Sequence, residues 1–248
     1  MERFERKEYK YYVPSSSLEL LRDRVRNHMD HDPHCRDLED HRYVVRSIYL
    51  DTTNLLFYYE KIDGQAYRKK LRIRTYNNPE EKGLAFLEIK RKIEDTILKE
   101  RALIEFDETE KLSNGANIQL APKEGNSHAG RVTLNRFIFL TKRLQLSPKV
   151  LITYEREAFE DELNPDLRIT FDMNVRSYYE PTYQQIFQEK DLRTFTDPYF
   201  ILEVKFSTVM PLWVREVIRD FRLHQQSISK YCLGLDCWTD CTCKMDQA

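Results

Sequence analysis

Charged side chains alternate with apolar ones along seven strand-like stretches of this chain. The stretches are 6–10, 71–74, 87–92, 98–101, 154–156, 167–172 and 202–206. Residues i and i+2 of a β-strand point to the same face, so each stretch predicts one apolar face and one charged face. Most of the charges are Arg and Lys, which bind phosphate oxygens. One such strand is an ordinary surface strand, but seven indicate that the charged faces enclose an anionic guest.

Alternation assigns a definite set of side chains to these charged faces. The set is Arg6, Glu8, Lys10, Arg72, Arg74, Glu88, Lys90, Lys92, Lys99, Arg101, Tyr154, Arg156, Arg168, Thr170, Asp172, Glu203 and Lys205. Carboxylates among so many bases can pair with them, or can hold a hard cation such as Mg²⁺ or Mn²⁺ against phosphates. The pattern predicts a site for a linear, repeating polyanion; solvated faces of amphipathic strands are the alternative.

Eight strands and several helices are needed to position these side chains. We expect strands over 6–13, 43–51, 67–76, 84–92, 97–106, 149–159, 167–175 and 199–206, and helices over about 18–29, 55–61, 213–221, 227–235 and parts of 107–147. Because most strands are consecutive pairs, the sheet should be antiparallel, and closure into a barrel would remove its exposed edges. The expected fold class is therefore α+β, an eight-stranded antiparallel β-barrel with flanking helices, in a single domain over 1–248.

Composition excludes several classes of protein. The chain has 248 residues, of which 41% are hydrophobic, enough for a sizeable core. Its 40 basic and 41 acidic residues give a net charge of −1, so the overall charge predicts no nucleic-acid partner. No apolar run approaches the roughly 18–20 residues of a membrane span, and the start lacks the apolar core of a signal peptide. We expect a cytoplasmic protein; the oligomeric state stays open.

Two segments carry histidines and cysteines that could suggest a metal site. The segment 28–41 holds four histidines and Cys35, but Pro33 and the intervening aspartates favour a solvated loop over a helix that aligns ligands. The segment 232–243 holds four cysteines without CxxC pairs, so we interpret them as free thiols. The chain also lacks the glycine-rich GxxxxGK[ST] signature, which argues against a P-loop kinase.

In their order along the chain, the charged segments resemble the VTC domain, the polyphosphate polymerase branch of the triphosphate tunnel metalloenzyme (CYTH-like) superfamily. The matching segments are 8–11, 47–52, 71–74, 88–90, 99–101, 154–159, 167–172, 202–205 and 229–231. Arg6-x-Glu8-x-Lys10 is similar to a degenerate form of the ExExK strand of that superfamily. Arg6 in place of the first Glu removes one potential metal carboxylate, which disfavours a simple triphosphatase.

The resemblance implies an eight-stranded tunnel and transfer of the γ-phosphate of ATP to a growing inorganic polyphosphate chain, with Mn²⁺ or Mg²⁺. It implies phosphate ligands at Lys10, Lys61, Arg72, Arg74, Lys90, Lys99, Arg156 and Arg168, further contacts from Tyr154, Ser229 and Lys230, and a metal ligand at Glu203. Arg72, Arg74, Lys90, Arg156, Arg168 and Glu203 are the expected catalytic set. A triphosphatase of the same fold and a non-catalytic polyphosphate-binding module are the alternatives, and a separate membrane partner is possible.

Overall fold

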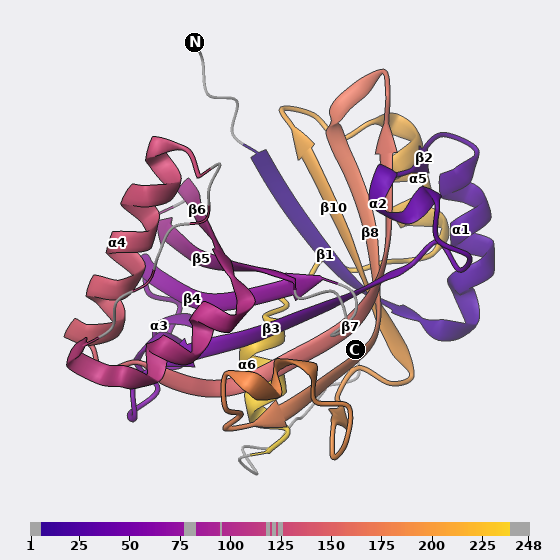
Figure 1. Ribbon diagram of the computed structural model, residues 1–248. Helices are drawn as coiled ribbons and strands as arrows, with labels where there is room; N and C mark the ends of the chain where they lie inside the picture. Colours follow the sequence, from indigo (N-terminus) through magenta and orange to yellow (C-terminus); the bar gives the residue numbers. More distant parts are fainter. Residues whose placement is uncertain are drawn as a thin grey trace. The chain divides into compact units, whose positions relative to one another are not determined.

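The computed structural model describes residues 6–76, 83–94, 96–117, 120, 123 and 126–238 (Figure 1). The chain divides into two compact units. The first unit takes its described residues from 1–44, 154–175 and 194–229, and the second from 45–153, 176–193 and 230–248. Strands β3 (Tyr43–Asp51), β7 (Ser147–Asp161) and β8 (Asn164–Tyr179) contribute residues to both units. The single domain expected over 1–248 stays a prediction.

The strands form one sheet with eight strands on its hydrogen-bonded path. The order is β1-β10-β8-β7-β3-β4-β5-β6, where β1 is Arg6–Pro14, β4 is Tyr67–Tyr76, β5 is Leu84–Ile93, β6 is Thr96–Glu105 and β10 is Tyr199–Ser207. Two strands of two residues, β2 (Asp30–His31) and β9 (Arg193–Thr194), lie off this path and were not predicted. The expected α+β class, with an antiparallel eight-strand sheet and flanking helices, is confirmed.

In the first unit, the apolar strand faces are covered by two amphipathic helices. Leu21 and Val25 of α1 (Leu18–Arg26) and Val214 and Val217 of α5 (Leu212–Asp220) are buried in one cluster with the strand residues. That cluster includes Tyr11, Val13, Leu167, Ile169, Phe171, Phe200, Leu202, Val204 and Phe206. Figure 1 shows α1 and α5 beside β8 and β10. The charged faces of the same strands are therefore turned away from this core.

In the second unit, α4 (His128–Arg143) and α3 (Leu56–Ile62) help to cover the apolar faces of β3 to β6. Phe137 of α4 and Phe57 of α3 are fully buried in the cluster that contains the strand residues Ile48, Leu50, Leu71, Ile73, Ala85, Leu87, Ile89, Ala102 and Ile104. Burying such a side chain contributes about 1.5–3 kcal/mol. Ser127 accepts a hydrogen bond from Gly130 N at 3.1 Å and so fixes the start of α4.

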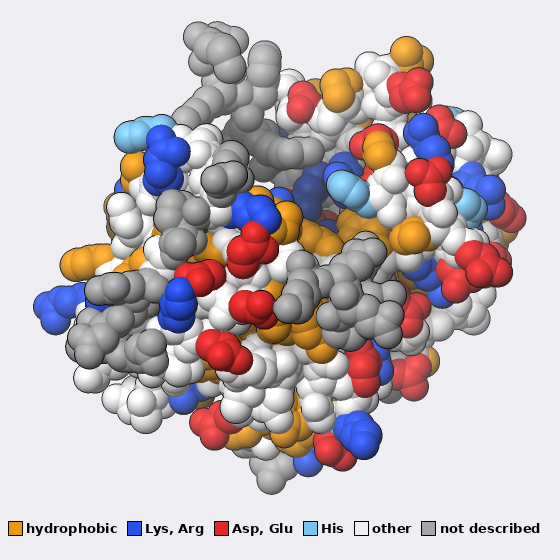
Figure 2. All heavy atoms as spheres, viewed as in Figure 1, with side chains coloured by type: hydrophobic (Ala, Val, Ile, Leu, Met, Phe, Trp, Pro, Cys, Tyr) orange, Lys and Arg blue, Asp and Glu red, His pale blue; other side chains and the backbone are white. Residues whose placement is uncertain are grey.

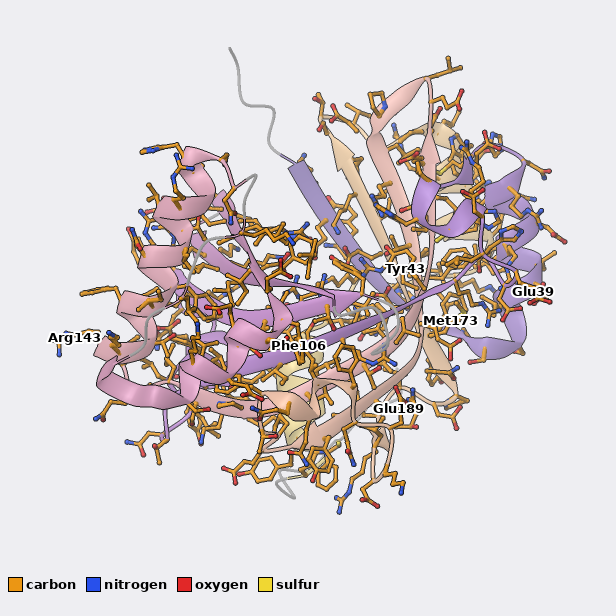
Figure 3. All side chains as sticks on the ribbon, in the orientation of Figure 1. Glu39, Tyr43, Phe106, Arg143, Met173 and Glu189 are labelled. Atoms are coloured by element: carbon orange, nitrogen blue, oxygen red, sulfur yellow. The ribbon has the colours of Figure 1, made fainter. Side chains whose placement is uncertain are left out.

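Shorter elements of the second unit complete its core. The helix η2 (Phe106–Asn117) is a 3₁₀ helix, and Phe106 contacts Phe187 of η3 (Gln184–Phe187) with ring centroids 5.1 Å apart. Beyond η3, Glu189 accepts hydrogen bonds from Arg46 at 2.6 Å and Arg176 at 3.3 Å. Phe106, Glu189 and Arg143, the last residue of α4, are labelled in Figure 3. Within 107–147, helix is thus limited to η2 and α4 among the described residues.

The segment 28–41 is more ordered than the predicted solvated loop. Pro33–Arg36 form the short helix α2, in which Pro33 occupies the first position, where a missing N–H costs nothing. The buried carboxylate of Asp32 accepts hydrogen bonds from His34 N and Cys35 N, both at 3.0 Å. Cys35 is fully buried. The described residues contain no group of three or more His, Cys, Asp or Glu side chains that could hold a metal ion.

The remaining elements match their expected positions closely. The terminal helix α6 spans Lys230–Asp236, slightly shorter than expected, and η1 (Ser15–Ser17) precedes α1. No helix within the described part of the chain is long and apolar enough to cross a membrane. Figure 2 shows basic and acidic side chains interspersed on the surface in view, in keeping with the balanced charge. The segregation of charge that the sequence predicts therefore has to be sought on the strand faces.

Candidate functional site: two charged strand faces

Cross-strand pairing in the second unit builds a face dominated by basic side chains. Arg72 lies opposite Tyr49 on one side and Glu88 on the other, and Glu88 lies opposite Arg101. We call this the arginine–lysine face; it consists of Ser47, Tyr49, Lys70, Arg72, Arg74, Glu88, Lys90, Lys99 and Arg101. Four of the predicted phosphate ligands, Arg72, Arg74, Lys90 and Lys99, are thus brought together on one surface.

Glu88 is the centre of this face. It is 1% exposed, and its Oε2 accepts from Arg72 Nε at 2.6 Å. Its Oε1 accepts from Arg101 Nε at 2.8 Å and lies 2.9 Å from Lys99 Nζ. Burial would raise the pKa of Glu88, but the charges of Arg72, Arg74, Lys99 and Arg101 outweigh burial and hold the pKa well below its usual range. Glu88 is therefore an ionised carboxylate that orients three bases.

Two hydroxyl groups on β3 orient the arginines from the other side. Arg72 Nη1 donates to Tyr49 Oη at 2.9 Å, and Arg74 Nε donates to Ser47 Oγ at 3.0 Å. Burial would raise the pKa of Tyr49, but Arg72, Arg74 and Lys70 together lower it to about 8. The sequence assigned no role to Ser47 and Tyr49, because the segment 43–51 carries little charge alternation. The only sequence signal for Ser47 and Tyr49 is that the segment 47–52 resembles a segment of the VTC domain.

A row of three lysines crosses the same face. Lys70 lies directly opposite Lys90, and Lys90 lies directly opposite Lys99. Like charges in directly opposite positions destabilise a sheet. Burial lowers the pKa of Lys99 to about 8; Glu88 opposes this shift, and Arg72 and Arg101 add to it. A bound anion would relieve the repulsion between these ammonium groups.

The charged face of the first unit differs because its bases have carboxylate neighbours. We call it the mixed face; it consists of Glu8, Lys10, Tyr154, Arg156, Arg168, Thr170, Asp172, Glu203 and Lys205. Asp172 is fully buried and accepts from Arg156 Nε at 2.6 Å and Nη2 at 2.8 Å. Burial would lower the pKa of Arg156, but Asp172 outweighs burial and raises it. The guanidinium also lies 5.3 Å from the centroid of the Tyr154 ring, so its orientation is fixed.

Glu203, the predicted metal ligand, is 5% exposed on the mixed face. Its carboxylate forms an ion pair with Lys205 and lies 3.7 Å from Lys10 Nζ. Lys10 also contacts Glu8 at 2.8 Å, so two carboxylates share one ammonium group. Oxygen ligands of this kind suit a hard divalent cation, and two carboxylates leave most of its coordination to phosphate oxygens or water. The chemistry of these residues therefore fits a hard divalent cation such as Mn²⁺ or Mg²⁺, with oxygen atoms of a bound anion or of water as its other ligands.

Arg168 is positioned by a residue that the sequence did not single out. Its Nη2 forms an ion pair with Asp32, the carboxylate that begins α2. The two residues are 136 positions apart, so no local pattern could have paired them. Thr170 follows Arg168 on the same face of the strand; it is 1% exposed, and its Oγ1 has no hydrogen-bond partner among the described atoms.

Three predicted site residues lie outside the strands. Lys61 is in the last turn of α3, Ser229 is 9% exposed before α6, and Lys230 is the first residue of α6. Arg6 pairs with Ser207 through the backbone, and its side chain lies outside the described part of the chain. The family-based assignments of Lys61, Ser229 and Lys230 stay predictions.

Comparisons with known proteins give one decisive result. No curated protein matches the chain. Among solved structures, a chain of "Structure of the Schizosaccharomyces pombe Mediator head module" is similar at 7% identity, covering 88% of this chain and 90% of that one with a TM-score of 0.42. The model of the VTC domain, a family associated with polyphosphate synthesis, matches residues 5–239. Because this match covers nearly the whole sequence, the chain belongs to the VTC domain family.

Proposed function

We propose that this protein is a polyphosphate polymerase that transfers the γ-phosphate of ATP to a growing inorganic polyphosphate chain, with Mn²⁺ or Mg²⁺ as cofactor. ATP and inorganic polyphosphate are its proposed partners. Membership of the VTC domain family supports the substrate class, and the two charged faces support binding of phosphate groups. A cytoplasmic location and a separate membrane partner stay predictions.

One observation carries the proposal: the row of Lys70, Lys90 and Lys99 on the arginine–lysine face. Three ammonium groups in directly opposite positions repel one another, and the pair of Lys99 with Glu88 offsets part of this repulsion. A multivalent anion bound along the row would lower the repulsion further. A polyphosphate chain carries charge at every phosphate and matches a repeated row of bases.

The arginine–lysine face would bind phosphates through Arg72, Arg74, Lys90 and Lys99. Arg72 is held by Glu88 and Tyr49, and Arg74 is held by Ser47, so both are oriented before any phosphate arrives. Such preorganisation avoids paying side-chain entropy at the moment of binding. It also directs positive charge to the equatorial oxygens of the transferred phosphoryl group, which carry the charge in the transition state.

The mixed face would contribute Lys10, Arg156 and Arg168 as phosphate ligands and Glu203 as metal ligand. When bound, the cation neutralises phosphate charge and eases departure of ADP. Glu203, with Glu8 nearby, would hold it, while Lys205 and Lys10 balance the carboxylates in its absence. The terminal phosphate of the chain is already anionic, so the reaction requires no general base from the protein.

Incubation of the purified protein with ATP and Mn²⁺ tests this proposal. Phosphorus NMR should show the internal phosphate signal of a chain growing as ATP is consumed, and a gel should show long polyanions. Release of orthophosphate alone would sink the proposal and indicate a hydrolase, which turnover of tripolyphosphate would then identify. Binding of polyphosphate without any turnover would indicate a non-catalytic binding module.

A further inference from the structure

Asp51, at the end of β3, is a fully buried carboxylate that accepts hydrogen bonds from residues of two different helices, α3 and α6, as well as from the adjacent Thr52. Its Oδ1 accepts from Thr52 N at 2.7 Å and Phe57 N at 3.0 Å, and its Oδ2 accepts from Tyr58 N at 3.0 Å. The bonds from Phe57 and Tyr58 satisfy backbone donors at the start of α3. Oδ2 also accepts from Tyr231 Oη at 2.5 Å. Asp51 therefore ties α6 to the strand that carries Tyr49.

Tyr231 connects Asp51 with the arginine–lysine face. Its ring stacks on Tyr49, with centroids 5.2 Å apart and planes 23° apart, and Lys70 Nζ lies 5.8 Å from the ring centroid. Tyr49 in turn accepts a hydrogen bond from Arg72. Burial and then Asp51 raise the pKa of Tyr231, so its hydroxyl keeps the proton that it donates. A continuous set of contacts thus runs from Asp51 through Tyr231 to the phosphate-binding arginine.

Lys230 begins α6 and directly precedes Tyr231. A helix of seven residues is only marginally stable by itself, so its position depends on tertiary contacts. The other end of α6 has a similar tie, because Tyr58 Oη donates to Asp236 at 2.6 Å. The first tie fixes the end with Lys230, and the second fixes the opposite end.

We infer that Asp51 and Tyr231 are positioning residues that hold the Lys230 end of α6 against Tyr49 and thereby present the Lys230 ammonium group to phosphate bound on the arginine–lysine face. This inference rests on the proposed function and on the prediction, implied by the family resemblance, that Lys230 contacts bound phosphate. A lysine on a loosely held helix end loses several rotatable bonds when it binds, and a fixed backbone removes part of that cost. Neither Asp51 nor Tyr231 needs to touch phosphate for this role.

A double-mutant cycle tests the inference. Tyr231→Phe keeps the ring stacked on Tyr49 and removes only the hydroxyl that Asp51 accepts. We expect Tyr231→Phe and Lys230→Ala each to weaken binding of a polyphosphate of defined length roughly tenfold, measured by calorimetry. The double variant should bind no more weakly than Lys230→Ala alone, because Tyr231 acts through Lys230. Independent, additive losses would overturn the inference.

Tyr58→Phe is the matched control, because it removes the hydroxyl–carboxylate bond at the other end of α6. Its affinity should stay within about twofold of the wild type; an equal loss would overturn the specific role of Tyr231. Amine labelling read by mass spectrometry gives a second measurement: polyphosphate should protect Lys230 in the wild type and protect it less in Tyr231→Phe. A wild type that binds no polyphosphate would reject the proposed function together with the inference, whereas additive losses in a protein that binds would reject the inference alone.

Discussion

The two charged faces solve the same electrostatic problem in opposite ways. On the mixed face, Arg156 is matched by Asp172, Arg168 by Asp32, and Lys10 and Lys205 by Glu203. On the arginine–lysine face, the single carboxylate Glu88 pairs with Arg72, Lys99 and Arg101 at once. A matched face is stable before any ligand arrives and can fix geometry. A face with excess positive charge is completed by an anion, so it should supply most of the affinity for polyphosphate.

The largest expected effect on activity comes from the mixed face. Glu203→Gln keeps the shape of the side chain and removes the charge that would hold the cation. We expect metal-dependent synthesis to fall at least about 100-fold, equivalent to about 2.7 kcal/mol, while polyphosphate affinity changes little. Initial rates with ATP and Mn²⁺, and calorimetry with polyphosphate, measure the two effects.

Glu155→Gln is the matched control for that change. Glu155 is also a carboxylate of the first unit, but it contacts Arg42 at 3.5 Å and Asn174 at 2.8 Å rather than Lys10 or Lys205. Its replacement should leave synthesis unchanged. If Glu203→Gln retained full synthesis, the assignment of the metal to the mixed face would be wrong.

The next effect separates the two faces by stability. Arg156→Ala leaves the buried Asp172 carboxylate without its bidentate partner, and the free energy of unfolding should fall by about 3–5 kcal/mol. Glu88→Gln should also destabilise the protein, because it leaves three bases without their carboxylate. Polyphosphate should restore stability to Glu88→Gln by binding the folded state, and should restore much less to Arg156→Ala. Urea denaturation with and without polyphosphate measures the free energy of unfolding of the two variants. An equal gain of stability in both variants would contradict the distinction between the faces.

The sequence predicts these faces because alternation along a strand is a local signal. Arg72 and Arg74, or Lys10 and Glu8, reveal their common side through spacing alone. The central position of Glu88 depends on how three strands align, and register between strands is not written in any one of them. The pairing of Arg168 with Asp32 and of Tyr231 with Asp51 depends on long-range packing. Alternation therefore predicts which side chains share a face, and tertiary structure decides which carboxylate orients which base.

A smaller effect is pH dependence, which should have opposite signs for affinity and stability. The pKa of Lys99 is lowered from its ordinary value of 10.5 to about 8, and the pKa of Tyr49 is lowered from 10.0 to about 8. As pH rises through 8, Lys99 loses positive charge and Tyr49 gains negative charge, so polyphosphate affinity should fall. Between about pH 8 and 10, the unfolded chain keeps these two protons while the folded protein loses them. The free energy of unfolding of the ligand-free protein should therefore rise with pH over this range.

Lys99→Arg checks this assignment, because a guanidinium stays charged throughout that range. The decline of affinity above pH 8 should become shallower in Lys99→Arg, as measured by calorimetry at several pH values. A decline of unchanged steepness would mean that Lys99 does not titrate in the binding equilibrium.

The smallest expected effect comes from two hydroxyl groups, one on each face. Ser47 accepts a hydrogen bond from Arg74 at 3.0 Å, so Ser47→Ala should weaken polyphosphate binding by about threefold through a less ordered arginine. Thr170 is buried without a hydrogen-bond partner among the described atoms, so Thr170→Val should raise the free energy of unfolding by up to about 1 kcal/mol. Loss of stability in Thr170→Val, together with full polyphosphate affinity in Ser47→Ala, would contradict the assignment of affinity to the arginine–lysine face and of fixed geometry to the mixed face. Ser47→Ala removes a hydroxyl that already has a partner, so a loss of affinity is expected. Thr170→Val removes a hydroxyl without a partner among the described atoms, so a gain of stability is expected.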